Sequence, residues 1–259
     1  FSGVIGATTL DTLTVGDAGA AAGSAKFTNT VAIATTITVS GGNDDAEDSS
    51  VEFENTVSAT SITLDDTSTA RTATVIFDTN SGDITYTGTI TGGSGDEGIL
   101  IVRDDDASTT APNTVTFSGI IGANALDTLT VGTSTLGGSA IFSNTTGPSI
   151  GAITITGGND GAEDSVVEFQ DSLTATSIVL NDTSSGGVSS VEFNATNGAQ
   201  TVSGTINAGS AGEGTLLVTD DDNNEAGQAI SFSGIVGGTA SIGAVTIGSA
   251  TEAGLAIFG

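Results

Sequence analysis

The feature that most constrains the fold is an internal repeat with a period of 116 residues. The segment FSGVIG at residues 1–6 returns as FSGIIG at 117–122 and as FSGIVG at 232–237, where the interval is one residue shorter. We therefore divide the chain into repeat 1 (1–116), repeat 2 (117–231) and the start of a third repeat (232–259). Repeats of this kind bury their apolar residues against their neighbours. We expect one continuous array, of which these residues are a window.

A shorter period lies inside each repeat. Strand-like runs, in which apolar residues alternate with Thr, Ser or Glu, are centred near residues 13, 26, 38, 52, 63, 76, 87, 101 and 116. Such alternation is typical of half-buried strands. Every second run ends in Phe, as at Phe27, Phe53 and Phe77. The sequence therefore predicts an all-β fold with about nine short strands in each repeat and a two-strand unit of roughly 25 residues.

Two architectures fit this spacing. A unit of about 25 residues cannot bury its own apolar face, but it can when coiled on its neighbours. This favours a right-handed parallel β-helix, a β-solenoid in which successive Phe side chains stack along the axis and glycines occupy the tight corners. The alternative is a tandem array of immunoglobulin-like β-sandwiches, one per repeat. The recurrence of Val-x-Phe inside each repeat favours the solenoid.

The composition excludes most catalytic machinery. The chain has no Cys and no His. It therefore has no thiol nucleophile, no Ser-His or Cys-His pair, and no zinc or haem site of the usual kind. Carboxylate pairs remain, but each recurs with its repeat, as structural features do. We predict no catalytic residue and no enzymatic activity.

The net charge of −28 also limits the partners. It arises from 31 acidic and 3 basic residues. Nucleic acid and anionic membrane surfaces are excluded as partners, because contacts with phosphates need Lys and Arg. The chain has no apolar run long enough for a transmembrane helix. Salt or divalent cations relieve the repulsion that such a charge creates, which favours an extracellular or cell-surface location.

The acidic loops are candidate calcium sites, since calcium binds six to eight oxygen ligands. The alternative is that they are solvated turns, because neither the EF-hand spacing nor the calcium-binding nonapeptide of β-helices is present. No other cofactor is expected. The candidate ligands are Asn43, Asp44, Asp45, Glu47, Asp48, Asp104, Asp105, Asp106, Asn159, Asp160, Glu163, Asp164, Asp220, Asp221 and Asp222.

The segments VTFSGIIG (115–122) and ALDTLTVG (125–132) resemble the units of bacterial β-strand-repeat surface proteins. These are similar to filamentous-haemagglutinin-type and autotransporter adhesins and to some S-layer-like proteins. The resemblance implies a structural component of an extracellular filament, sheath or surface layer, a homopolymer whose main partner is itself. The alternative is the stalk of a cell-surface adhesin, with surface glycans as partners. Ice binding or polysaccharide binding is a remote alternative, because residues 84–91 place Thr at alternate positions.

Overall fold

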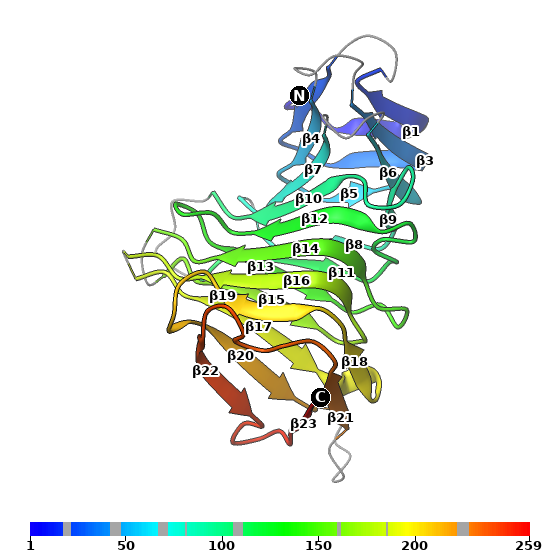
Figure 1. Ribbon diagram of the computed structural model, residues 1–259. Helices are drawn as coiled ribbons and strands as arrows, with labels where there is room; N and C mark the ends of the chain where they lie inside the picture. Colours follow the sequence, from blue (N-terminus) through cyan, green and yellow to red (C-terminus); the bar gives the residue numbers. More distant parts are fainter. Residues whose placement is uncertain are drawn as a thin grey trace.

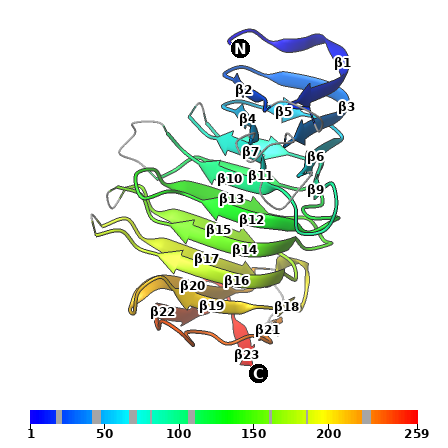
Figure 2. The same cartoon turned by 45° about the horizontal axis from the view of Figure 1, so that its top comes forward.

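The computed structural model describes residues 1–17, 22–41, 48–66, 72–80, 82–105, 111–159, 162–184, 186–221 and 228–259. It is a β-solenoid of about nine turns, stacked so that the two termini lie at opposite ends (Figures 1 and 2). Every pairing between named strands is parallel. The predicted solenoid is therefore confirmed. The immunoglobulin-like alternative is wrong, because such sandwiches are antiparallel.

Four sheets run along the stack, and we number them I to IV from the N-terminal end. Sheet I contains β1 (Ile5–Val15), β3 (Val31–Ser40), β5 (Val57–Ser58), β6 (Ser61–Asp65) and β9 (Thr89–Gly92). Sheet II contains β2 (Ser24–Phe27), β4 (Ser49–Phe53), β7 (Ala73–Asp78), β10 (Ile99–Arg103), β12 (Leu126–Val131), β14 (Ser149–Thr156), β16 (Thr174–Asn181) and β19 (Thr205–Ala208).

Sheet III contains β8 (Ile84–Tyr86), β11 (Thr114–Phe117), β13 (Gly138–Phe142), β15 (Ser165–Phe169), β17 (Ser189–Asn194), β20 (Glu213–Thr219) and β22 (Ile242–Ile247). Sheet IV contains β18 (Gln200–Val202), β21 (Ala229–Phe232) and β23 (Leu255–Phe258). The 3₁₀ turn η1 (Ala195–Asn197) is the one helical element of the described residues. The run predicted near residue 87 is split into β8 and β9, which belong to different sheets.

Each turn consists of a leading strand, a corner and a trailing strand. In repeat 1 the leading strands lie in sheet I and the trailing strands in sheet II. In repeat 2 the leading strands β12, β14, β16 and β19 lie in sheet II, and the trailing strands lie in sheet III. The shift follows from the odd number of runs per repeat, because nine runs at two per turn make four and a half turns. Equivalent residues of the two repeats, such as Phe53 and Phe169, therefore lie in different sheets.

The core is a ladder of Phe side chains from the trailing strands. Ring centroids of Phe117 and Phe142 are 5.1 Å apart, and those of Phe142 and Phe169 are 5.0 Å apart, with the rings nearly parallel. Where the trailing strands move from sheet II to sheet III, Phe77 and Phe117 meet edge to face at 89°. Both stacked and edge-to-face pairs are favourable ring geometries. The predicted ladder is confirmed, and it continues through the junction between the repeats.

The corners need glycine where the backbone turns left-handed. Gly132 follows β12 with φ of +69°, and a Cβ there would lie 2.0 Å from Oγ of the buried Ser165. Gly16, at the equivalent corner of repeat 1, has φ of +82°, and a Cβ there would lie 2.3 Å from Oγ of Ser49. A side chain at either glycine would strain the backbone and displace the serine. The expectation that glycines occupy tight corners is confirmed at both positions.

Candidate functional site

The most regular polar feature is a carboxylate that joins consecutive turns at a corner. In repeat 1, Oδ1 of Asp66 accepts a hydrogen bond from the Ala73 amide, and Oδ2 accepts one from the Gly98 amide at 3.0 Å. In repeat 2, 116 residues later, Asp182 accepts bonds from the amides of Ser189 (2.8 Å) and Gly214 (2.9 Å). Burial raises the pKa of Asp66 more than these bonds lower it. The carboxylate thus accepts hydrogen bonds from backbone amides of two successive turns.

Replacing Asp182 by alanine should lower the free energy of unfolding by about 2–3 kcal/mol. The loss has a clear cause, since the Ser189 amide and hydroxyl and the Gly214 amide each lose their acceptor. Urea unfolding followed by circular dichroism measures the loss. The matched control is Asp127→Ala, an exposed carboxylate whose one hydrogen bond within the described part of the chain comes from the neighbouring Thr128 hydroxyl. For this variant we expect a change below about 0.5 kcal/mol. Equal losses in the two variants would contradict the capping role.

Several predicted calcium ligands also accept backbone hydrogen bonds. Asp48 accepts one from the Thr72 amide at 3.0 Å, and its repeat-2 equivalent Asp164 accepts one from the Val188 amide at 2.8 Å. Asp104 accepts one from the Asn113 amide at 2.6 Å. Its equivalent Asp220 accepts from the Gln228 amide. Asp104 and Asp220 thus join the two ends of their own loops, whereas Asp48 and Asp164 each join two neighbouring turns.

Four further candidates, Asn159, Glu163, Asp105 and Asp221, are also hydrogen-bonded within the chain. Glu163 accepts a bond from the Asn159 amide at 2.7 Å, and Asp221 accepts one from the Thr196 hydroxyl at 2.5 Å. The Asp105 amide donates to Asp78 at 3.2 Å. Among the described residues, no three acidic side chains converge as metal ligands would. The remaining candidates, Asn43, Asp44, Asp45, Glu47, Asp106, Asp160 and Asp222, lie outside the described residues, so calcium binding there stays a prediction.

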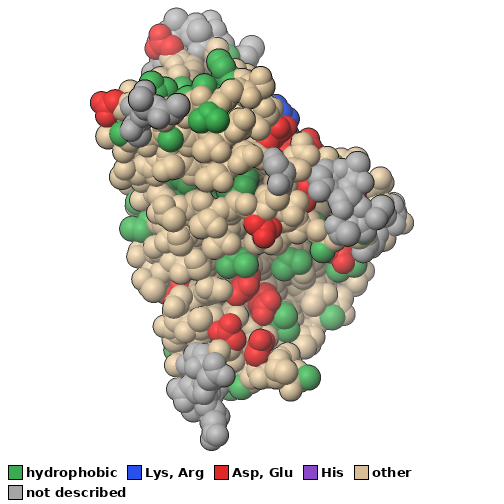
Figure 3. Space-filling view, turned by 180° about the vertical axis from the view of Figure 1, so that it is seen from behind, with side chains coloured by type: hydrophobic (Ala, Val, Ile, Leu, Met, Phe, Trp, Pro, Cys, Tyr) green, Lys and Arg blue, Asp and Glu red, His purple; other side chains and the backbone are tan. Residues whose placement is uncertain are grey.

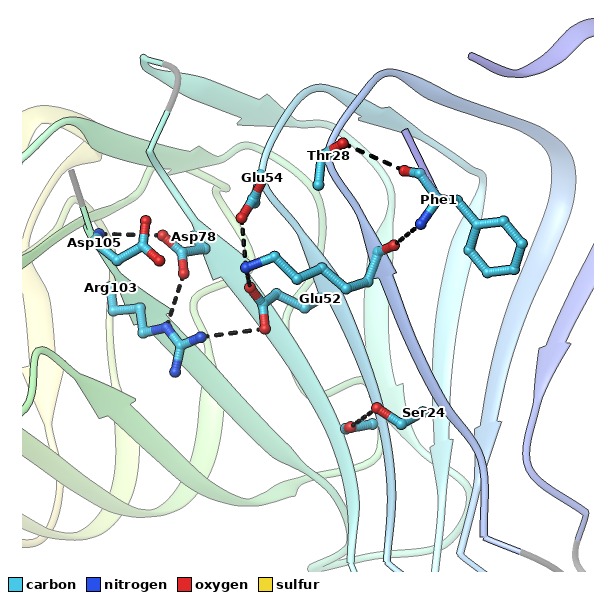
Figure 4. Close-up of polar contacts among 10 residues, drawn as sticks. Phe1, Ser24, Thr28, Glu52, Glu54, Asp78, Arg103 and Asp105 are labelled. Carbon is cyan, nitrogen blue, oxygen red and sulfur yellow. Dashed lines mark hydrogen bonds and ion pairs between the residues drawn. The ribbon is translucent and has the colours of Figure 1, made fainter. Parts of the chain in front are cut away.

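A second polar feature is an ion-pair cluster on the trailing strands of repeat 1, shown in Figure 4. The Lys26 ammonium lies 2.6 Å from Glu52 and 2.5 Å from Glu54. The Arg103 guanidinium lies 3.2 Å from Glu52 and 2.9 Å from Asp78. Asp78 is fully buried, and burial raises its pKa more than the Arg103 hydrogen bond lowers it. Two of the three basic residues of the chain are therefore used to neutralise neighbouring carboxylates.

The cluster is rebuilt without cations in repeat 2. Ile141 and Thr219 stand where repeat 1 has Lys26 and Arg103, while Gln170 and Asn194 stand where it has Glu54 and Asp78. Glu168, the equivalent of Glu52, now accepts hydrogen bonds from Gln170 at 2.8 Å and Asn194 at 3.1 Å. The cluster of repeat 1 contains two cations and three anions, and its equivalent in repeat 2 contains one anion. Both clusters therefore have a net charge of −1.

Repeat 2 gains one carboxylate beside this position. Glu192 replaces Ile76 and accepts a hydrogen bond from the Thr219 hydroxyl at 2.6 Å. Burial raises the pKa of Glu192, and the nearby carboxylates of Glu168, Glu252 and Asp221 raise it further. The face seen from behind in Figure 3 has red acidic side chains along much of its length and blue at one place near its upper edge. Negative charge is thus spread along the solenoid.

The third feature is the pair of open ends. Within the described residues, β1 pairs only with β3, β22 only with β20 and β23 only with β21. All but one of the exposed large hydrophobic side chains lie at these ends; Val188 is the exception. The N-terminal end exposes Phe1, Val4 and Leu10. The C-terminal end exposes Ile235, Val245, Ile247, Leu255, Ile257 and Phe258. Each end thus combines an unpaired strand edge with apolar side chains.

Comparison with family models, with curated proteins and with solved structures gives no match for this chain. In the part of the chain that the structure describes, no helix is long and apolar enough to cross a membrane. The functional argument therefore rests on the geometry of the solenoid and its ends.

Proposed function

We propose that this chain is a structural rod that assembles end to end into an extracellular filament, sheath or surface layer. The observation that carries the proposal is one stack of parallel strands whose Phe ladder runs unbroken from repeat 1 into repeat 2, so that further copies can extend the same rod. Unpaired edges are templates for pairing with another chain. A contact between two different ends of the same molecule does not close on itself, and it therefore produces an open polymer.

The flanks of the rod favour growth along the axis over growth from the side. Leading strands expose hydroxyls there, as at Thr130 and Thr154, and their apolar residues point into the core. The trailing strands of repeat 2 add carboxylates, such as Glu168 and Glu192. Like charges repel rods that approach side by side, whereas the ends offer apolar area to bury. A setting outside the cell suits the proposal, because salt there screens a net charge of −28.

The proposal predicts association that depends on the end strands. At about 1 M salt, where the Debye length is about 3 Å, sedimentation velocity should show species that grow in size with protein concentration. Val245→Lys should abolish this growth, because it places a charge on the apolar side of the free strand β22. The matched control is Thr154→Lys, on an outward position of a leading strand in the middle of the stack, which should assemble as the wild type does.

Two outcomes would count against the proposal. A wild-type chain that stays monomeric across the concentration range would overturn it. If Thr154→Lys blocks assembly and Val245→Lys does not, the contact between molecules lies on the flank of the rod and not at its ends. Thermal melting of both variants checks that the solenoid itself is intact.

A further inference from the structure

We propose that the outward face of sheet I is an ice-binding surface, whose partner is the ordered water layer of an ice crystal. The face belongs to the strands β1, β3, β6 and β9, which lie one above another on one side of the stack (Figures 1 and 2). It lies on the flank of the rod, so strands that stack at either end cover none of it. Ice binding there is therefore independent of the end-to-end assembly.

The face carries two columns of hydroxyl side chains, to which each of the four strands contributes one residue per column. The strand registers place these residues in a first column, Thr12, Thr36, Ser61 and Thr89, and a second column, Thr14, Thr38, Thr63 and Thr91. All of them are exposed or half-buried, whereas Ile37 and Ile62, which lie between the columns, are fully buried. The strands thus present a regular net of hydroxyl and methyl groups to the solvent.

The dimensions of this net follow from β geometry. Side chains on neighbouring strands repeat at about 4.8 Å, and side chains two residues apart on one strand repeat at about 6.7 Å. Water oxygens on the prism faces of ice repeat in a rectangular net of nearly these dimensions. A hydroxyl donates one hydrogen bond and accepts up to two, so it can stand in for a water of that net. Each Thr methyl also leaves liquid water when ice covers it, which favours binding.

Most hydroxyls of the second column are open to such a partner. Among the described residues, those of Thr14, Thr38 and Thr63 have no hydrogen-bond partner. Thr91, at the edge of the net, is used within the chain, because its hydroxyl accepts a bond from the Asn124 amide at 2.9 Å. The second column can therefore bind water over three successive strands.

The first column has an order of its own. The hydroxyls of Thr36 and Ser61 lie 3.1 Å apart and are hydrogen-bonded to each other, which holds both side chains in one orientation. Each of these hydroxyls still has capacity to bond to water. The net is thus partly ordered before any partner binds, which lowers the entropy cost of binding.

The net is not a by-product of the repeat. In repeat 2 the core positions of the leading strands stay apolar, as at Ile153 and Ile178. The outward positions do not keep Thr, since Thr36, Thr63 and Thr91 have the equivalents Ala152, Val179 and Asn207. The solenoid is therefore built equally well with other residues at these places, and strand formation alone does not explain a face of Thr in repeat 1.

Charge and aromatic content favour ice over other flat partners. Neither column contains a charged or aromatic side chain, although the chain as a whole has a net charge of −28. Ice is neutral and excludes ions, so a neutral face suits it. A mineral surface would need charged side chains, and a crystalline polysaccharide presents sugar rings that stack on exposed aromatic side chains.

Ice-affinity partitioning of the chain in dilute buffer tests this assignment. An ice crystal is grown slowly from the solution, and the fraction of protein taken into the ice is measured; it should exceed that of a globular protein of similar charge. Thr38→Lys should lower this fraction at least about tenfold, a loss of about 1.4 kcal/mol in binding, because a hydrated ammonium projects from the net. The matched control is Thr154→Lys, the equivalent position of repeat 2, which should partition as the wild type does.

A second pair of variants repeats the comparison, with Thr63→Lys in the net and Val179→Lys as its control. Thermal melting checks that all these variants are folded. Exclusion of the wild type from ice would overturn ice binding. Equal losses in Thr38→Lys and Thr154→Lys would overturn its placement on sheet I. Exclusion from ice, together with binding to crystalline cellulose that Thr38→Lys abolishes, would replace ice by a polysaccharide surface.

Discussion

Replacing Arg103 by threonine should lower the free energy of unfolding by about 3–5 kcal/mol, because it leaves the Asp78 carboxylate buried without its cation. Adding Asp78→Asn should recover most of that loss. The double variant reproduces the Thr219 and Asn194 of repeat 2, where the same two positions carry no charge and donate hydrogen bonds to Glu192 and Glu168. Repeat 2 thus shows that the solenoid can be built with a neutral pair of residues at these two positions.

Urea unfolding of the two single variants and the double variant forms a double-mutant cycle that isolates the coupling between the residues. The control is the Lys26–Glu54 pair of the same cluster, which is more exposed than the Arg103–Asp78 pair. Lys26 is 46% exposed on its side chain, so Lys26→Ile with Glu54→Gln should show a coupling of at most about 1 kcal/mol. Additive losses at Arg103 and Asp78 would contradict the interpretation of the cluster as an ion pair rebuilt in neutral form.

The loss in Arg103→Thr should also depend on pH. Burial raises the pKa of Asp78 in the folded state, so the folded protein binds a proton at a higher pH than the unfolded chain does. Stability is therefore gained as the pH falls from the raised pKa towards the ordinary value of 3.8. In the variant, the hydrogen bond and charge of Arg103 no longer lower the pKa of Asp78, so that pKa should rise further and the variant should gain more stability than wild type on acidification. The deficit of the variant should therefore shrink as the pH falls, and a deficit that grows would contradict this assignment.

Replacing Phe117 by alanine should also cost about 3–5 kcal/mol, because the ring is fully buried and its removal leaves a cavity. Phe117 contacts Phe77 edge to face and Phe142 in a stack, at the point where the ladder passes from sheet II to sheet III. The variant removes the ring that joins the two repeats. Denaturant unfolding should therefore show a large fall in midpoint.

The control for Phe117→Ala is Thr116→Ala, the neighbouring outward residue on β11. Thr116 does not point into the core, so removing its hydroxyl should leave the core packing unchanged. The free energy of unfolding should change by less than about 0.5 kcal/mol. If Phe117→Ala were tolerated as well as the control, the Phe ladder would not be the core that joins the repeats.

Much of the fold could be predicted from the sequence because a solenoid is a local structure. Each strand run, such as the one around Leu129, pairs with runs about 25 residues away, so the spacing alone predicts the stack. The shift between sheets was also present in the sequence, since nine runs per repeat is an odd number. What the run centres could not show is that the run near residue 87 bends at Thr87 and Gly88 into two strands.

The polar sites were less predictable because their partners are distant in sequence. Asp66 accepts a hydrogen bond from the amide of Gly98, which is 32 residues away. A loop rich in carboxylates also has the same sequence pattern whether it binds calcium or caps amides. The cluster around Arg103 escaped prediction, although one signal was available. Both cations disappear in repeat 2 together with two of their anionic partners, a paired change that indicates contact.

Electron cryomicroscopy of the wild-type chain in high salt tests the central claim, end-to-end stacking, most directly. We predict filaments one solenoid wide, in which strands lie across the axis and rungs about 4.8 Å apart continue without a break from one copy to the next. Filaments or sheets in which molecules associate by their flanks, or fields of separate monomers at every concentration, would contradict the claim.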